Sequence, residues 1–223
     1  MSATLDELAV LPASDQAYQI HYQDDVLLIV SKPTHLLTVP GRHPQNRDCL
    51  ISRVQREFPT AQVVHRLDYD TSGLVVLPLT KKALSEISKQ FQARTVHKEY
   101  QALVVGEVPP NGEIALPIAA DPDNRPLYKI CQHNGKASLT HYTRLEFNPK
   151  TGYSRVLLQP VTGRSHQLRL HLAAIGHPMV GDTLYAPPRV AQAAERLMLH
   201  AWQISLTHPL SAKLLKIELP PSF

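Results

Sequence analysis

The segment VVHRLDYDTSGLVVLPLT, residues 63–80, places a cluster of ionisable side chains between two apolar runs. Runs of Val and Leu are typical of buried strands, and small turn residues would be enough to join two of them. Here the connection instead contains His65, Arg66, Asp68 and Asp70. An Asp held beside an Arg by rigid flanking strands is an unfavourable way to make a turn, so the segment predicts a functional site.

Asp68 and Asp70 are two positions apart, and their carboxylates therefore point to the same side of an extended chain. In that arrangement the two groups can share acid–base work, as paired carboxylates do in glycosidases. Alternatively, they accept hydrogen bonds from backbone N–H groups of the turn at residues 71–73. The spacing of the two acids is compatible with both interpretations.

The bulk composition describes an ordinary globular chain of 223 residues, of which 43% are hydrophobic. That length is sufficient for one domain with a full core. No apolar run approaches the roughly 20 residues of a membrane helix, and the N-terminus lacks the pattern of a secretory signal. Cys49 and Cys131 have no CxxC spacing, which argues against a disulfide framework or a zinc site. We therefore expect a cytoplasmic protein that does not enter a membrane.

Charge is distributed unevenly along the chain. Residues 1–31 contain five acidic side chains and no Lys or Arg. The remaining residues carry all 23 Lys and Arg against the other 14 of the 19 acidic residues, a net charge of +9. A basic body of this kind favours a polyanionic partner, with nucleic acid as the first candidate.

Apolar and alternating patterns predict a series of strands. The expected strands cover residues 26–30, 73–80, 98–106, 138–147, 153–161, 202–207 and 213–219. A helix is expected over residues 81–94, with Thr80 as its N-cap. Leu84, Ile87 and Phe91 would share the apolar face of that helix. Strands joined by hairpins and interrupted by a few helices indicate an α+β fold with a mostly antiparallel sheet.

Two further segments have helical patterns. Residues 167–172 alternate like a strand, but Ser165 as a cap and Gly176 as the C-terminal residue bracket a helix. We predict the helix, in which Arg169 lies at the edge of the apolar face. Its guanidinium then either reaches inward to a carboxylate or lies at the surface with its stem along the protein. A second helix is expected over residues 189–198.

The domain organisation is expected to be simple. Residues 1–20 are predicted to form a loose acidic extension. Residues 21–223 contain no internal repeat, low-complexity tract or long Gly/Ser linker. They are therefore predicted to form a single domain.

His166, His171, His177 and Asp182 invite interpretation as a metal site. Their spacing does not match HExxH, and residues five or six apart do not align on one face of a helix, so no metal is expected. The sequence also contains no GxGxxG or GxxxxGK(S/T) phosphate loop and no GxSxG elbow. A nucleotide cofactor and serine-hydrolase chemistry therefore have no support.

HRLDYDTSG, residues 65–73, resembles the HRLDxxTSG signature of the RluA-type pseudouridine synthases. KEYQALVVG (98–106) resembles the second motif of that family, and TGRSHQLRLHLAAIGHPMVGDTLY (162–185) resembles the third. LMLHAWQISLTHP (197–209) is similar to the C-terminal segment of the family. The resemblance begins at about residue 21 and continues to the end of the chain, with the motifs in the family's order.

This resemblance implies the catalytic fold of the family, a mixed and mostly antiparallel sheet with flanking helices and a central RNA-binding cleft, without an S4 domain. LLTVPGR (36–42) and the stretch 120–136 are most similar to members that modify both 23S rRNA and tRNA. The implied tRNA target is the first uridine of the anticodon loop. A synthase specific for one site and a non-catalytic RNA-binding module are the alternatives. We expect RNA stem-loops as partners, a monomer as the oligomeric state, and no cofactor.

The resemblance also implies catalytic roles. Asp68 corresponds to the catalytic aspartate, which acts either as a nucleophile at C1′ or as a base at C2′ of the ribose. Tyr100 corresponds to the active-site tyrosine, and Arg169 to the arginine that forms an ion pair with the aspartate. Asp70 has no catalytic counterpart, because the family pattern tolerates other residues at its position.

Four residues are implied to bind the substrate: His65, Arg66, Arg164 and Leu199. Arg66 corresponds to an arginine that enters the RNA where the target uridine leaves, and Leu199 to an aliphatic residue that lines the pocket. His35, in KPTHLL, departs from the family pattern, which usually has Gly there. Because Gly permits a positive φ, we expect this turn to have a different shape.

Overall fold

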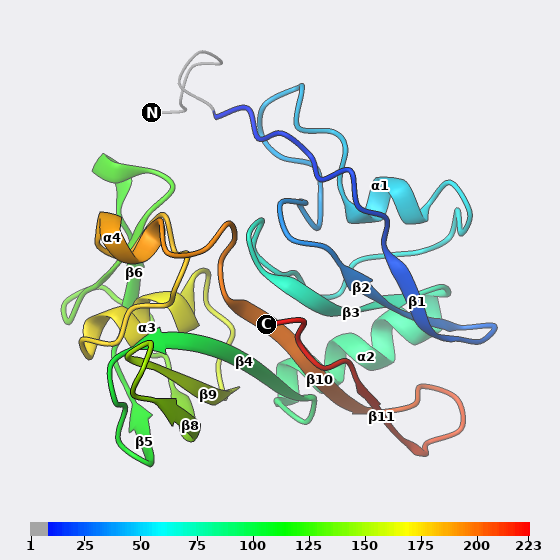
Figure 1. Ribbon diagram of the computed structural model, residues 1–223. Coiled ribbons are helices and arrows are strands. Elements are labelled where there is room, and N and C mark those ends of the chain that lie inside the picture. Colours follow the sequence, from blue (N-terminus) through cyan, green and yellow to red (C-terminus); the bar gives the residue numbers. More distant parts are fainter. Residues whose placement is uncertain (1–8) are drawn as a thin grey trace. The chain divides into compact units, whose positions relative to one another are not determined.

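The computed structural model describes residues 9–223 (Figure 1). Asp6 and Glu7 of the acidic N-terminal segment therefore lie outside the described residues. The chain divides into two units. The first unit contains the chain up to Val96 together with Gln203–Leu219, and the second contains His97–Trp202 and Pro220–Phe223.

The first unit is built on antiparallel strands. β2 (Leu27–Lys32) lies between β1 (Gln19–Gln23) and β3 (Ser72–Pro78). β10 (Leu199–Thr207) follows β3 in the order of hydrogen-bonded strands, and its residues in this unit pair with β11 (Leu214–Glu218). All residues of β3 are buried, which explains why its sequence is continuously apolar rather than alternating. The predicted strands of this unit are confirmed.

α2 (Lys81–Ala93) packs against this sheet. Ala83 and Ile87 are fully buried and form a cluster with apolar residues of β2 and β3. Thr80 caps the helix as predicted, because its Oγ1 accepts a hydrogen bond from the backbone N–H of Ala83 at 3.2 Å. The helix ends at Arg94, which adopts the left-handed conformation with φ 59°. The predicted helix over residues 81–94 is therefore confirmed.

Three features of the first unit differ from the sequence-based expectation. Val63 and Val64 form no strand, so the HRLDYD segment is followed but not preceded by a strand. α1 (Leu50–Val54) was not expected, because five residues are too few to establish a helical period. His35 adopts a positive φ of 54° although it is not Gly. The prediction of a different turn is wrong for this angle, since His35 takes the conformation that a Gly would permit.

The prediction of a loose N-terminal extension up to residue 20 is wrong for its described part. β1 already begins at Gln19, and residues 9–16 are hydrogen-bonded to the rest of the first unit. For example, the backbone N–H of Ser14 donates to the carbonyl oxygen of His35 at 2.7 Å. Composition could not reveal this attachment, because most of its bonds involve backbone groups.

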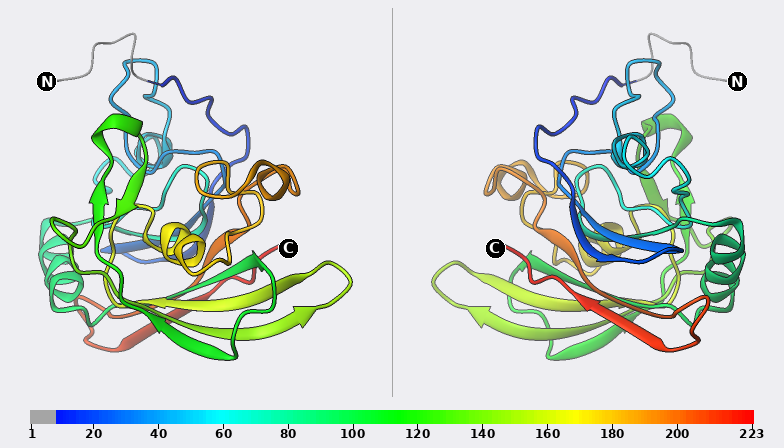
Figure 2. Two further views of the ribbon diagram at one scale, coloured as in Figure 1. Left: turned by 90° about the vertical axis from the view of Figure 1, so that its left-hand side faces the viewer. Right: turned by 90° about the vertical axis from the view of Figure 1, so that its right-hand side faces the viewer.

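The second unit contains a sheet with the strand order β4-β9-β8-β5, in which every pair is antiparallel. The strands are β4 (His97–Val105), β9 (Tyr153–Pro160), β8 (Thr140–Asn148) and β5 (Asn111–Ile114). β8 and β9 form the long yellow-green hairpin in Figure 2. The strands predicted over residues 98–106, 138–147 and 153–161 are confirmed.

A separate antiparallel pair, β6 (Ile118–Ala120) and β7 (Tyr128–Ile130), is connected through the short 3-10 helix η2 (Pro122–Asn124). The sequence patterns did not predict this pair, because strands of three residues carry almost no periodic signal. Among the described residues, no helix has both the length and the apolar character needed to cross a membrane. The α+β class predicted from the sequence is confirmed.

α3 (Gln167–Ala174) is the helix predicted over the HQLRLHL segment. Its buried Leu168 and Leu172 pack with apolar residues of β4 and β9. The helix begins after His166, which has a left-handed φ of 55°, rather than after the expected Ser165. Gly176, with φ 84°, ends it as predicted.

The helix predicted over residues 189–198 is wrong. Only α4 (Pro188–Ala191) is helical, and the chain then becomes irregular and extended. Leu197 is buried, and the backbone N–H of Met198 donates to the carbonyl oxygen of Val180 at 2.9 Å. Leu197 therefore reaches the core from a chain that is not helical, because tertiary hydrogen bonds replace the helical ones.

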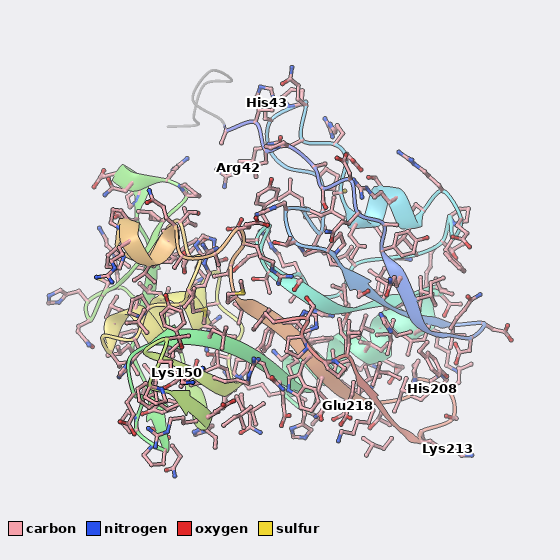
Figure 3. The ribbon with its side chains drawn as sticks, viewed as in Figure 1. Arg42, His43, Lys150, His208, Lys213 and Glu218 are labelled. Atoms are coloured by element: carbon pink, nitrogen blue, oxygen red, sulfur yellow. The ribbon has the colours of Figure 1, made fainter. Side chains whose placement is uncertain are left out.

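Asp24 joins the start of β2 to the residue after β10. Its Oδ1 accepts hydrogen bonds from the N–H groups of Val26 and Leu27 at 2.9 and 2.8 Å. Its Oδ2 accepts from the Tyr22 hydroxyl and from Nε2 of His208, each at 2.7 Å. His208 lies at the β10–β11 connection (Figure 3). Partial burial alone would raise the pKa of Asp24, but the hydrogen bonds outweigh it and hold that pKa below its ordinary value.

We expect Asp24→Asn to reduce the free energy of unfolding by about 1 kcal/mol at pH 7, because an amide would turn a donor toward Tyr22 or His208. A lowered carboxyl pKa in the folded state stabilises the fold above the ordinary pKa of Asp, and this stabilisation is lost as the pH falls further. The difference between the two proteins should therefore shrink below about pH 4. Urea unfolding at several pH values measures it, and Asp25→Asn, at an exposed neighbouring residue, serves as the control.

Candidate active site

The loop that carries Asp68 is held by side chains from the segment after β2. The Thr38 hydroxyl donates to the carbonyl oxygen of Leu67 at 2.8 Å and accepts from the N–H of the same residue at 3.1 Å. The Thr34 hydroxyl donates to the carbonyl oxygen of Asp70 at 2.8 Å. The backbone is therefore fixed on both sides of Asp68 although the loop has no regular secondary structure.

Lys32 makes the deepest of these attachments. Its side chain is almost fully buried, and Nζ donates to the carbonyl oxygens of Pro33, Leu36 and Tyr69 at 2.9, 2.7 and 3.2 Å. The backbone N–H of Leu36 donates to the same Tyr69 oxygen at 3.2 Å. A buried ammonium is unfavourable unless it is hydrogen-bonded, so Lys32 requires the two loop segments to stay together. Sequence reasoning missed Lys32, whose signal is a cation at the end of the apolar run LLIVSK.

Asp68 is half-buried, so part of the residue remains exposed. The N–H of Thr71 donates to the main-chain oxygen of Asp68 at 3.2 Å, so a carbonyl group rather than a carboxylate caps this position of the turn. Asp70 is also half-buried, and its carbonyl oxygen is bonded by Thr34. The two acids thus differ in the partner of their carbonyl oxygen, which is the N–H of Thr71 for Asp68 and the hydroxyl of Thr34 for Asp70.

His65 and Arg66 precede Asp68 and differ in exposure. The half-buried ring of His65 stacks on Phe91, with centroids 4.8 Å apart and an interplanar angle of 25°. Its Nε2 accepts a hydrogen bond from the N–H of Val76 at 2.9 Å, so this nitrogen carries no proton. Arg66 is exposed and can contact a large ligand. One ring nitrogen of His65 is already occupied by the hydrogen bond from Val76 of β3. Substrate binding by either residue remains a prediction.

Tyr100 and Leu199 are brought together in the second unit. Tyr100 lies on β4 and pairs in register with Leu158 of β9. It packs against the cluster of buried apolar residues in the second unit that includes Leu168 and Leu172 of α3. Leu199 is 3% exposed and belongs to that cluster. The two residues are far apart in sequence, and the apolar packing of β4 and β10 explains their proximity. Direct contact with a substrate remains a prediction for both.

Arg169 is 1% exposed, and its guanidinium forms a bidentate ion pair with Asp182. Nε donates to Oδ2 at 3.0 Å and Nη2 donates to Oδ1 at 2.6 Å. The ring of Tyr185 lies 5.6 Å from the guanidinium carbon. Of the two orientations considered for Arg169, the inward one is observed, and Asp182 is a partner that sequence reasoning considered only as a metal ligand. An ion pair between Arg169 and Asp68 stays a prediction.

Asp182 also fixes the backbone beyond it. Its Oδ1 accepts hydrogen bonds from the N–H groups of Leu184 and Tyr185 at 2.9 and 3.2 Å. A buried ion pair is favourable only when its remaining donors and acceptors are satisfied, and these bonds satisfy the carboxylate. The GHPMVGDTLY segment therefore acts as a support for Arg169.

A buried polar network holds the turn that contains Arg164. Oε1 of Gln167 accepts from the Thr162 hydroxyl at 2.8 Å and from the N–H of Arg164 at 3.0 Å. Nε2 of Gln167 donates to the carbonyl oxygen of Leu139 and to Oγ1 of Thr140, each at 3.0 Å. The side chain of Arg164 is exposed. The network therefore fixes the backbone of Arg164 and leaves its guanidinium accessible, while substrate binding by it stays a prediction.

The histidines of this region have separate structural partners. His171 is fully buried, with Nδ1 2.9 Å from Oγ1 of Thr140 and Nε2 2.9 Å from the carbonyl oxygen of Leu116, and burial lowers its pKa. Nδ1 of His177 lies 2.7 Å from the carbonyl oxygen of Val105. Within residues 9–223, no group of three or more His, Cys, Asp or Glu side chains is arranged to hold a metal ion.

The chain is similar to known proteins of one family. The family model described as RNA pseudouridylate synthase matches residues 26–174. The chain is 43% identical over 213 residues to the dual-specificity RNA pseudouridine synthase RluA of Escherichia coli K12, covering 95% of this chain and 97% of the relative. It is 48% identical over 189 residues to the protein of the same name from Yersinia pestis, covering 84% of this chain and 91% of the relative.

Solved structures give the same result. Human RNA pseudouridylate synthase domain containing 1 superposes with a TM-score of 0.79 at 31% identity, covering 95% of this chain and 86% of that chain. Human RNA pseudouridylate synthase domain containing 4 gives a TM-score of 0.72 at 24% identity, covering 92% and 89%, and supports the fold alone. The chain belongs to the RNA pseudouridylate synthase family. It is an isomerase that acts on RNA, as the resemblance of its motifs predicted.

We expect Asp182→Asn to destabilise the protein by about 3 kcal/mol, because an amide leaves part of the buried Arg169 guanidinium without an acceptor. Isomerase activity should fall as well, since Arg169 would lose its fixed orientation. Urea unfolding and initial rates measure the two effects. Asp123→Asn, at an exposed residue of η2, should change the stability by less than about 0.5 kcal/mol. Equal stability of the two variants would contradict the supporting role of Asp182.

Proposed function

We propose that this enzyme converts specific uridines to pseudouridine in both 23S rRNA and tRNA. The proposed tRNA target is the first uridine of the anticodon loop. Several relatives that carry the name dual-specificity RNA pseudouridine synthase are 42–48% identical over at least 84% of the chain, which supports this proposal. We further propose that the enzyme acts in the cytoplasm as a monomer, in keeping with its two free cysteines.

Asp68 is assigned as the catalytic carboxylate. Formation of pseudouridine breaks the bond between N1 and C1′, turns the base and joins C5 to C1′. The product contains the same atoms as the substrate, so the reaction requires no redox group. One carboxylate can act as a nucleophile at C1′ or as a base at C2′. The observation that carries the assignment is that backbone bonds fix the chain on both sides of Asp68 while the residue itself is only half-buried.

Tyr100 is assigned to contact the uracil base, and Arg169 is assigned to interact with the carboxylate of Asp68. Tyr100 would stack on the uracil ring and help to remove the proton from C5. Arg169 would keep Asp68 ionised, because a nearby guanidinium favours the charged form of a carboxylate. The half-buried position of Tyr100 in the apolar cluster supports a stacking role. The rigid support of Arg169 by Asp182 suits a guanidinium with a fixed direction.

Arg66 is assigned to base flipping. A uridine in a stem or stacked loop must leave its stack before it reacts, at a cost of a few kcal/mol. A planar, exposed guanidinium can fill the gap and stack on the neighbouring bases. His65, Arg164 and Leu199 are assigned to the surroundings of the substrate. The net charge of +9 after residue 31 would add a general attraction for phosphates.

We expect Asp68→Asn to fold normally and to bind RNA with a dissociation constant within about threefold of the wild type, because phosphate contacts dominate affinity. Its product should be undetectable, since an amide is neither a nucleophile nor a base here. Asp70→Asn is the matched control on the same loop and should retain most of the activity. Filter binding and a tritium-release assay measure the two properties. Full turnover by Asp68→Asn would remove it from the catalytic role.

For dual specificity, we expect sites in both 23S rRNA and tRNA to lose pseudouridine when the gene is deleted from its host. Carbodiimide-based mapping of total RNA identifies the sites, and plasmid-borne wild type should restore them whereas Asp68→Asn should not. Loss of pseudouridine from one RNA class alone would show a single-site enzyme. That result would overturn the proposed dual specificity without affecting membership of the family.

A further inference from the structure

Residues 9–16, here called the strap, belong to the first unit. Side chains from elsewhere in that unit hold the backbone of the strap by hydrogen bonds. Asn46, which is 5% exposed, receives the N–H of Leu11 on Oδ1 at 2.8 Å. Its Nδ2 donates to the carbonyl oxygen of Ala9, also at 2.8 Å. One buried amide therefore binds the strap through both a donor and an acceptor, as a strand partner would.

Arg53 of α1 binds the other end of the strap. Nη2 donates to the carbonyl oxygen of Ser14 at 2.6 Å, and Nη1 donates to that of Gln16 at 2.9 Å. The guanidinium is oriented by Asp48, which accepts from Nε and Nη2 at 2.7 Å each. The guanidinium of Arg53 thus uses one edge for the ion pair with Asp48 and another edge for the backbone of the strap.

The middle of the strap contacts the loop that carries Asp68. The hydroxyl of Tyr69, the residue directly after Asp68, donates to the carbonyl oxygen of Pro12. The ring of Tyr69 lies against His35, with centroids 5.6 Å apart, and the carbonyl oxygen of His35 accepts the N–H of Ser14 at 2.7 Å. Tyr69 and His35 therefore contact each other and also bind the strap at neighbouring residues.

The chemistry of these groups favours a lasting attachment. A carbonyl oxygen can only accept, so the Tyr69 hydroxyl must keep its proton. Burial, together with the charge of Asp70, raises the pKa of Tyr69 and keeps the hydroxyl protonated. His35 has a φ of 54°, which is unfavourable for a residue with a side chain. The hydrogen bond from Ser14 and the contact with the ring of Tyr69 help to hold His35 in this conformation.

We infer that the strap is a positioning element of the active site and that Tyr69 is the residue through which it acts on Asp68. This inference rests on the proposed catalytic role of Asp68. Lys32 holds the Tyr69 carbonyl from the interior, and the strap holds the Tyr69 hydroxyl from the other end of the residue. Fixing both ends restricts rotation of the backbone next to Asp68. A carboxylate that must reach one atom of the ribose, as a nucleophile or as a base, is sensitive to displacements of about 1 Å.

The experiment compares Tyr69→Phe with Tyr18→Phe in the full chain. The first variant removes the bond to Pro12 and keeps the ring against His35. The second removes the bond from the Tyr18 hydroxyl to Oε2 of Glu57 at 2.9 Å, just outside the strap. We expect kcat of Tyr69→Phe on a tRNA anticodon stem-loop to fall about fivefold, with KM changed by less than about twofold. Tyr18→Phe should change neither value.

Hydrogen exchange of the Ser14 N–H reports whether the strap stays in place, independently of catalysis. We expect faster exchange in Tyr69→Phe and wild-type exchange in Tyr18→Phe. An unchanged kcat for Tyr69→Phe would overturn the inference, whether or not the strap is released. An equal loss of kcat in both tyrosine variants would overturn it as well, because it would indicate general destabilisation.

The failure of this inference differs from failure of the proposed function. If Asp68→Asn is inactive and Tyr69→Phe has the wild-type kcat, the role of Asp68 stands and the strap is not a positioning element. If Asp68→Asn is fully active, the catalytic assignment fails and the positioning inference fails with it. A fivefold loss of kcat in Tyr69→Phe with faster exchange at Ser14 supports both.

Discussion

The buried ammonium of Lys32 is the interaction on which the Asp68 loop depends. The loop has no regular secondary structure, so its backbone polar groups need partners from elsewhere. Lys32 binds carbonyl oxygens from both segments of the loop, and Thr34 and Thr38 bind the residues that flank Asp68. A loop conformation that broke these bonds would remove hydrogen-bond acceptors from a buried charge, which is unfavourable. One lysine thus favours the observed arrangement of the loop.

The second unit follows the same physical principle with different groups. Arg169 is buried with Asp182, and Gln167 has a partner for each of its hydrogen-bonding atoms. Such networks add little net stability, but a partly satisfied alternative is strongly unfavourable. They therefore specify a conformation more than they strengthen the fold. Of the candidate catalytic residues, Asp68 lies on an irregular backbone that is fixed in this way, whereas Tyr100 lies on β4 and Arg169 on α3.

The fold was predictable where long segments carry a clear period. The strands around residues 73–80 and 153–161 and the helix that Thr80 caps were found from apolar spacing and capping residues. Short elements such as α1 and the β6–β7 pair were missed, because three to five residues contain no measurable period. The helix predicted over residues 189–198 failed because tertiary hydrogen bonds hold that chain extended.

By itself, the sequence determined the α+β class, the family and the identity of the candidate residues, because motifs record chemistry that must be present at given positions. Only the tertiary structure decided which residues support them. Lys32 reaches Tyr69 across 37 positions, and Arg169 reaches Asp182 across 13. Neither pair lies at a helical or strand spacing, so no local pattern could reveal it. The attachment of residues 9–16 was also hidden from the sequence. Distant side chains there bind backbone groups, which every sequence contains.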